Sequence, residues 1–153
     1  MANEPGGDLK RLYQQVILDH NRNPRNFGRP AESNRKAEGF NPVCGDQIAV
    51  HARVEGEAIA DIGFEGSGCA IAMASASLMT ERVKGASPGE AARLGERLTK
   101  MLQNPDDAGE DLGELIALSG VRHFPVRIKC AMLPWRTLQT ALEGTAGSPV
   151  TTE

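Results

Sequence analysis

Three cysteines and one aspartate are the residues of this sequence best suited to bind a metal or to act as nucleophiles. Cys44 and Asp46 are separated by a single glycine, Cys69 follows two closely spaced glycines, and Cys130 lies toward the C-terminal end. A thiolate and a carboxylate on either side of one glycine can turn toward the same point and share one ion. Together the four groups are ligands that zinc accepts, at about 2.3 Å for sulfur and about 2.0 to 2.2 Å for oxygen.

The spacing of these residues also leaves a second interpretation open. The cysteines lie far apart in the chain, unlike the compact Cys-x-x-Cys pairs of structural zinc sites, and a free cysteine often behaves as a small buried hydrophobe. The local context favours the metal site, because each cysteine lies beside a glycine turn or at the expected start of a helix. We therefore predict a metal site, on the condition that the fold brings the four groups to one end of a sheet.

Apolar alternation predicts the strands that position these ligands. Residues 47–54 and 59–64 place every second apolar side chain on one face and are expected to form a hairpin, preceded by a weaker strand at 36–40. Gly66 and Gly68 suit a tight turn from strand to helix, so residues 70–84 are predicted to be helical. Cys69 would then lie at a helix N-terminus, where free N–H groups and the helix dipole favour a thiolate.

The remaining segments complete a single domain over residues 8–143, with a disordered N-terminus over 1–7 and a flexible tail over 144–153. Pro134 is best tolerated in the first turn of a helix, so the last helix is predicted to begin close to Cys130. The other predicted elements are a helix from Asp8 to Asn23, a loop over 26–34, a helix capped by Ser87, a short helix over 112–118, an extended segment over 124–129 and a last helix around Trp135.

Length and charge narrow the class of protein. A chain of 153 residues is long enough for a real core. Its net charge of −3 and pI near 5.7 argue against a partner that is a nucleic acid or an anionic membrane. An odd number of cysteines, with neither a signal-like N-terminus nor a long apolar run, predicts a cytoplasmic protein whose thiols are reduced.

Several motifs, in order along the chain, resemble the SufU branch of the IscU/NifU-type iron–sulfur cluster assembly proteins. They cover the chain from about Leu9 to Leu142. The motifs are Leu12-Tyr13 with Val16-Ile17-Leu18-Asp19-His20, Asn23-Pro24-Arg25-Asn26 with Gly28, Asn41-Pro42-Val43-Cys44-Gly45-Asp46, Gly66-Ser67-Gly68-Cys69-Ala70-Ile71 with Ala74-Ser75-Ala76-Ser77, and Arg127-Ile128-Lys129-Cys130 with Trp135.

The resemblance implies a compact α+β fold, with a three-stranded antiparallel sheet packed against a layer of helices, and a metal site made by Cys44, Asp46, Cys69 and Cys130. Scaffold members of the family have histidine before the last cysteine. This chain has Lys129 there and an added segment at roughly 109–123. Both features resemble the SufU branch.

The expected function is therefore that of a zinc-dependent, sulfurtransferase-like acceptor. In this hypothesis Cys44, released from zinc by a histidine of the partner, takes persulfide sulfur from a SufS-like, pyridoxal-phosphate-dependent cysteine desulfurase and passes it to downstream iron–sulfur assembly proteins. The alternatives are a scaffold that binds iron or a nascent cluster, and a zinc-stabilised adaptor. Neither a nucleic acid nor a membrane is an expected partner.

The basic residues and the histidines have secondary roles in this hypothesis. Arg127 resembles a family residue that engages the desulfurase, although an ordinary solvated position is the alternative. His20 and His51 are predicted to be structural or surface groups, and His123 is a weak candidate for a group that supports the site. Asp19 and His20 are not expected to form a catalytic pair.

Overall fold

The structure is a computed structural model that describes residues 5–144 and 150–152, with side chains from Leu9 onward. Its elements follow the chain in the order α1, β1, β2, β3, α2, α3, η1, α4 and β4. The bounds are α1 Pro5–Arg22, β1 Arg35–Asn41, β2 Asp46–Glu55, β3 Ala58–Ser67, α2 Ala70–Val83, α3 Pro88–Gln103, the 3-10 helix η1 Gly113–His123, α4 Pro125–Glu143 and β4 Val150–Thr151.

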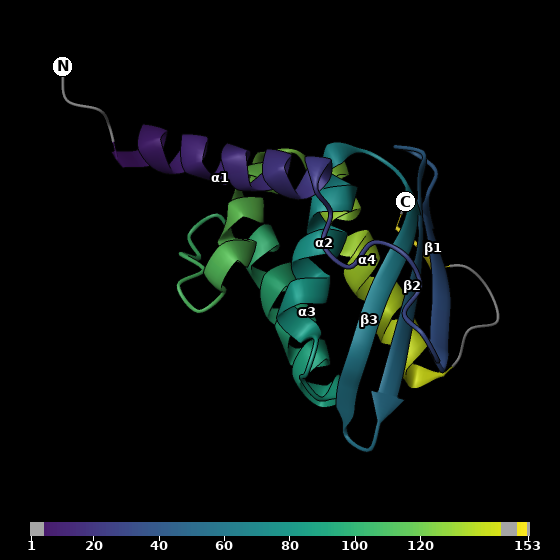
Figure 1. Ribbon diagram of the computed structural model, residues 1–153. Helices are drawn as coiled ribbons and strands as arrows, with labels where there is room; N and C mark the ends of the chain where they lie inside the picture. The colour runs from purple at the N-terminus through teal and green to yellow at the C-terminus, as the bar shows by residue number, and fades with distance from the viewer. Residues whose placement is uncertain (1–4, 145–149, 153) are drawn as a thin grey trace.

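The fold is α+β, with one sheet and a layer of helices on one of its faces (Figure 1). Strands β1, β2 and β3 are antiparallel neighbours, and their inward side chains, among them Val50, Ile62 and Phe64, are fully buried. Helix α4 lies against β1 and β2, and α2 packs between α4 and α1. Burial of one face of each strand explains the apolar alternation that predicted the hairpin.

The predicted three-stranded antiparallel sheet is wrong in one respect. The sheet has four strands in the order β3-β2-β1-β4, and β4 pairs with β1 in parallel. Val150 lies opposite Gly39, and the Thr152 N–H donates to the Phe40 carbonyl over 3.3 Å. A two-residue strand carries no alternation that a sequence pattern can detect, and residues 145–149, also in the predicted tail, lie outside the described part.

The predicted extended segment at 124–129 is also wrong, because α4 begins at Pro125. Proline at the first position of a helix lacks only an N–H that would have no helical partner there. Phe124 and Val126 are 59% and 46% exposed. Their alternation with basic residues therefore does not reflect burial against a sheet. Pro134 lies inside α4 and not in its first turn, which places Cys130 in the helix body.

The first helix begins earlier than predicted, since α1 starts at Pro5, while residues 1–4 lie outside the described part. His20 and His51 are both buried and hydrogen bonded within the fold. The Nδ1 atom of His20 is 2.7 Å from the Ser77 hydroxyl, which joins α1 to α2. Nε2 of His51 is 2.9 Å from Glu65. Because both rings are buried and hydrogen bonded to neighbouring elements, His20 and His51 are structural groups.

Hydrogen-bonded arginines hold residues 104–112, the segment between α3 and η1, against these two helices. Arg97 makes two hydrogen bonds with Asp107, of 2.7 and 2.8 Å, and a third of 2.9 Å with Asp111. Arg122 donates to the carbonyl of Asp107 over 2.6 Å. A forked pair of this kind fixes direction as well as distance, so residues 104–112 have a defined position against α3. No helix among the described residues is long and apolar enough to cross a membrane.

We expect the contribution of Arg97 to stability to depend on pH. Its hydrogen bonds hold the pKa of Asp107 and of Asp111 below the ordinary value of 3.8. A lowered folded-state pKa gives stability that is present above pH 4 or so and is lost as the pH falls through the folded pKa. Arg97→Gln should therefore melt at a lower temperature than the parent at pH 7, and the difference should shrink in acid.

The matched control is Arg93→Gln, because Arg93 is exposed one turn earlier on the same helix. Thermal melts between pH 3 and pH 7 provide the measurement. A difference in melting temperature that stays the same from pH 3 to pH 7 would contradict the ionic contribution, and coincident curves would show that the ion pairs add nothing to stability.

Candidate metal centre

The connection between β1 and β2 places the first two ligands. Asn41 and Asp46 are directly opposite each other in the strand pair, so residues 42–45 form the turn between them. Gly45 has a φ of +72°, a value that glycine adopts without strain. Cys44 is therefore held on a short turn and is partly exposed, whereas Asp46 begins β2 and is fully buried.

The end of β3 brings Cys69 beside Asp46. The Cys69 N–H donates to Oδ1 of Asp46 over 2.8 Å, and its Sγ lies 3.9 Å from Oδ2. As predicted, Cys69 is the N-cap of α2, and its sulfur accepts a long hydrogen bond of 3.5 Å from the Ala72 N–H. Gly68 permits this approach, because a Cβ at that position would lie 2.7 Å from Asp46 Oδ1.

Cys130 approaches the same point from α4. Its Sγ is 3.0 Å from the Sγ of Cys44, and the residue is fully buried. The ligand atoms of Cys44, Asp46 and Cys130 all lie within 4.8 Å of one another. Cys69 does not belong to this group of three, although its sulfur lies 3.9 Å from Asp46 Oδ2.

The charge state of Cys130 depends on whether a cation is present. Burial raises the pKa of its thiol far above the ordinary value, and hydrogen bonds with Cys44 and Asp46 act in the same direction. Without a cation the group is therefore a neutral thiol. A metal ion bound to the sulfur would reverse this preference, since coordinating thiols are deprotonated.

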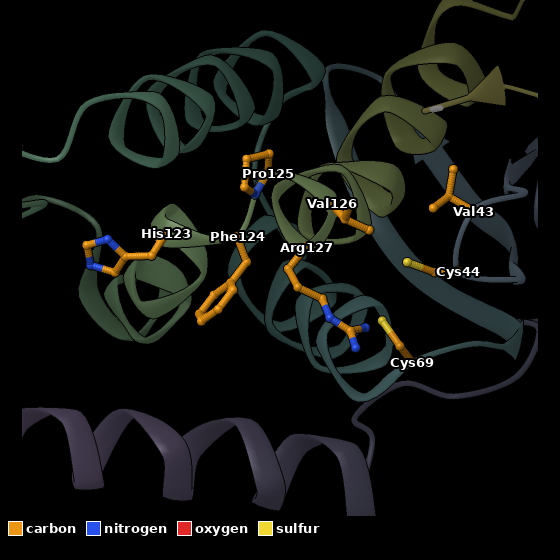
Figure 2. Close-up of a pocket in the computed structure, with 8 residues that line it drawn as sticks. All are labelled: Val43, Cys44, Cys69, His123, Phe124, Pro125, Val126 and Arg127. Atoms are coloured by element: carbon orange, nitrogen blue, oxygen red, sulfur yellow. The ribbon is translucent and has the colours of Figure 1, made fainter.

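Arg127 supplies positive charge at the open side of the cysteines. Its pKa is raised above the ordinary value mainly by the charge of Cys69, with smaller contributions from Cys130 and Cys44. Figure 2 shows its guanidinium group directed toward the sulfur of Cys69. The residue lies in the first turn of α4, three positions before Cys130, so one helix carries both.

A pocket of about 660 Å³ opens over these groups. Cys44 and Cys69 lie at one end of it, and Figure 2 shows the ring of His123 at the other end, turned away from the sulfurs. Much of the wall is apolar, and Val43 and Phe124 are 62% and 59% exposed. Lys129 is exposed and does not line the pocket. The lining residues are Val43, Cys44, Cys69, His123, Phe124, Pro125, Val126 and Arg127.

The donor set fits a thiophilic metal ion. Two thiol sulfurs and a buried carboxylate are already gathered, and the third sulfur is next to the carboxylate. Sulfur donors with one oxygen suit zinc or iron better than magnesium or calcium, which prefer oxygen alone. The Asp46 carboxylate is held by the Cys69 N–H, as carboxylates in metal sites commonly are.

Sequence reasoning missed one polar residue at this site. Asn41 is fully buried, and its side chain contacts both the turn at Val43 and the sulfur of Cys130. An asparagine two residues before a turn amide is a known signal for a side-chain cap on the turn. The contact with Cys130 depends on the packing of α4 against β1 and has no signal in the sequence.

Comparison with known proteins shows the family of this chain. The NifU-like N terminal domain matches residues 12–144. The chain is 44% identical to the "Zinc-dependent sulfurtransferase SufU" of Bacillus subtilis over 86% of this chain and 90% of that protein.

It is also 38% identical to the "Iron-sulfur cluster assembly scaffold protein IscU" of Streptococcus pyogenes, over 92% of this chain and 88% of that protein. A crystal structure described as a putative iron–sulfur cluster assembly scaffold protein for the SUF system, from Fervidobacterium islandicum, superposes with a TM-score of 0.79 at 32% identity, covering 86% of this chain and 97% of that one. The chain therefore belongs to the family of the NifU-like N terminal domain, and the resemblance to SufU and IscU proteins that its motifs carry is confirmed.

Proposed function

We propose that this protein accepts persulfide sulfur on Cys44 from a cysteine desulfurase and carries it toward iron–sulfur cluster assembly. The proposal further assigns a zinc centre to Cys44, Asp46, Cys69 and Cys130. It is supported by the donor set and by the similarity to a relative named as a zinc-dependent sulfurtransferase.

The observation that carries the choice of Cys44 is the difference in how the three cysteines are held. Cys130 is fully buried in the body of α4. Cys69 caps α2 and is bound to Asp46 through its backbone. Cys44 lines the open pocket, as Cys69 does, but it lies on a turn and has an exposed neighbour in Val43. Of the three, it is the sulfur that can meet an external reagent with the least rearrangement.

The transfer itself is a thiol exchange. The thiolate of Cys44 attacks the outer sulfur of the persulfide on the partner, a new S–S bond forms, and the partner's cysteine leaves as a thiolate. The products are a persulfide on Cys44 and a free cysteine on the desulfurase, with no net oxidation. When bound, zinc would keep the ligand thiols deprotonated at neutral pH.

In this proposal Arg127 acts at the entrance. Its guanidinium group lies beside Cys69 and is exposed at the pocket. A positive charge there favours approach of an anionic persulfide. The guanidinium group can also form two parallel hydrogen bonds with a carboxylate on the partner. The apolar wall around it, including Phe124 and Val126, provides contact area for a protein surface.

The test is incubation with a cysteine desulfurase and cysteine, followed by mass spectrometry of the peptide that contains Cys44. The parent should gain the mass of one sulfur atom on that peptide, and Cys44→Ala should gain none. Arg127→Ala should slow the gain, whereas Arg136→Ala should not, because Arg136 is exposed on the opposite side of the same helix, in the groove between α3 and α4. Equal sulfur uptake by Cys44→Ala would end the proposal.

The second candidate is a scaffold on which iron and sulfide assemble. The observation that favours it is the 38% identity to a protein named as an assembly scaffold, across nearly the whole chain. The same purified protein distinguishes the two. A visible, transferable cluster after reconstitution supports the scaffold, whereas bound zinc without colour, together with faster turnover of the desulfurase, supports sulfur transfer.

A further inference from the structure

Asn41 is a fully buried polar residue that contacts Cys130 of the proposed metal site but is not itself in the ligand set. It is the last residue of β1 and pairs with Asp46 across the strand pair. Its backbone already belongs to the sheet, so the side chain is not needed to satisfy the strand. A buried amide costs free energy unless both of its ends find partners, which makes the partners of this one informative.

The two ends of the amide have different partners. Oδ1 lies 3.1 Å from the backbone nitrogen of Val43, and Nδ2 lies 3.5 Å from the sulfur of Cys130. A backbone N–H can only donate, so the oxygen must face Val43 and the NH₂ group must face the sulfur. The orientation of the amide is therefore fixed by its surroundings, and Cys130 receives an N–H donor.

This arrangement links the two sulfurs that lie 3.0 Å apart. Through Val43 the amide oxygen holds the turn that carries Cys44, and through Nδ2 the same amide contacts Cys130 on α4. One rigid planar group thus spans two elements that are far apart in the sequence. A donor to a metal-bound sulfur also disperses part of its negative charge, and such supporting contacts commonly change metal affinity by about 10- to 100-fold.

We propose that Asn41 is a positioning residue of the metal centre, which sets the relative placement of Cys44 and Cys130 and donates a hydrogen bond to the Cys130 thiolate when a metal is bound. The inference rests on the metal site of the proposed function but not on sulfur transfer. It requires only that the cysteines bind a thiophilic cation.

The test compares Asn41→Asp with the parent. The substitution keeps the shape of the side chain and an oxygen for the Val43 N–H, but it removes the donor to Cys130 and places a carboxylate near the sulfur. We expect zinc affinity, measured by competition with a chelator, to fall by about 10- to 100-fold. With Co²⁺ as the probe, the sulfur-to-metal charge-transfer absorption should shift, a change that a merely structural residue would not cause.

The matched control is Asn34→Asp. Asn34 also binds β2 through both ends of its amide, accepting from the Val54 N–H and donating to the Val54 carbonyl, but it lies at the far end of β1 and β2. The Asn34→Asp substitution should leave zinc affinity and the cobalt spectrum unchanged. If Asn41→Asp does not fold, Asn41→Ser carries the same expectation, because its short hydroxyl does not reach Cys130.

Three results would overturn the inference. They are a parent-like affinity and cobalt spectrum in Asn41→Asp, loss of fold in both variants, and failure of the parent to bind zinc or cobalt. The proposed function fails separately: a parent that binds zinc yet takes up no sulfur refutes sulfur transfer and leaves the role of Asn41 to be decided by the affinities alone.

Discussion

Replacing Cys130 with serine is expected to lower the zinc affinity of this protein by at least about 100-fold, more than loss of a supporting contact alone. The change removes an anionic sulfur from a group of three ligand atoms that lie within 4.8 Å of one another. A serine hydroxyl stays neutral at the same buried position and is a poor ligand for zinc.

The measurement is a competition titration with a chromogenic chelator, repeated at several pH values. Because burial raises the pKa of the Cys130 thiol, metal binding in the parent must release that proton, and affinity should rise steeply with pH. The serine variant should show a shallower dependence. Met132→Leu is the control, since Met132 is buried two residues along the same helix. An affinity for Cys130→Ser equal to that of this control would remove Cys130 from the ligand set.

The second large effect is expected from Gly66→Ala, which should destabilise the fold by about 3 kcal/mol or more. Gly66 has a φ of +134°, and a Cβ there would lie 2.0 Å from the carbonyl oxygen of Gln47. An unfavourable backbone conformation costs about 1 to 3 kcal/mol, and overpacking against a rigid strand adds a similar amount. Against a total stability of about 5 to 15 kcal/mol, this is a large fraction.

Thermal and denaturant unfolding of the metal-free protein measure this effect. Gly120→Ala is the matched control, because nothing lies within 4 Å of a Cβ at that position and its φ is not positive. We expect the control to melt close to the parent and Gly66→Ala to melt well below it or to lack a cooperative transition. Equal melting temperatures for the two variants would mean that the turn relaxes at little cost, contrary to the crowding at Gln47.

The parts of the fold that sequence reasoning predicted correctly are those with a local cause. The hairpin follows from burial of one face of β2 and β3, where Val50 and Phe64 are fully buried. The position of Cys69 follows from two glycines that permit a turn no other residue type fits as well. These features depend on residues that are close together in the sequence, so the amino-acid sequence alone predicts them.

The errors concern elements whose cause lies elsewhere in the structure. The alternation of Phe124 and Val126 with basic residues imitates a strand, but both side chains are exposed at the pocket. Strand β4 forms because its backbone pairs with that of Gly39 and Phe40 on β1. Neither fact can be derived from local pattern, since each depends on what the folded chain places opposite.

The candidate site shows the same division. Ligand types and glycine turns nominate Cys44, Asp46, Cys69 and Cys130 but leave the alternative of buried, apolar cysteines open, and it is the family resemblance that makes the metal site specific. The structure brings three of these groups together and places Cys69 against Asp46. The contact of Asn41 with Cys130 required the packing of α4 on the sheet, because 89 residues separate the two in the chain.

The borders of the sheet have a consequence for where another protein can attach. Along β3, Gly28 and Asn26 exchange backbone hydrogen bonds with Phe64 and so occupy part of that border. Along β1, β4 pairs with Gly39 and Phe40, and the charged Lys36 and Glu38 of the same strand are exposed. Strand edges that are filled or charged are poor templates for adding a foreign strand. Addition of a foreign strand at these parts of the two borders is therefore disfavoured.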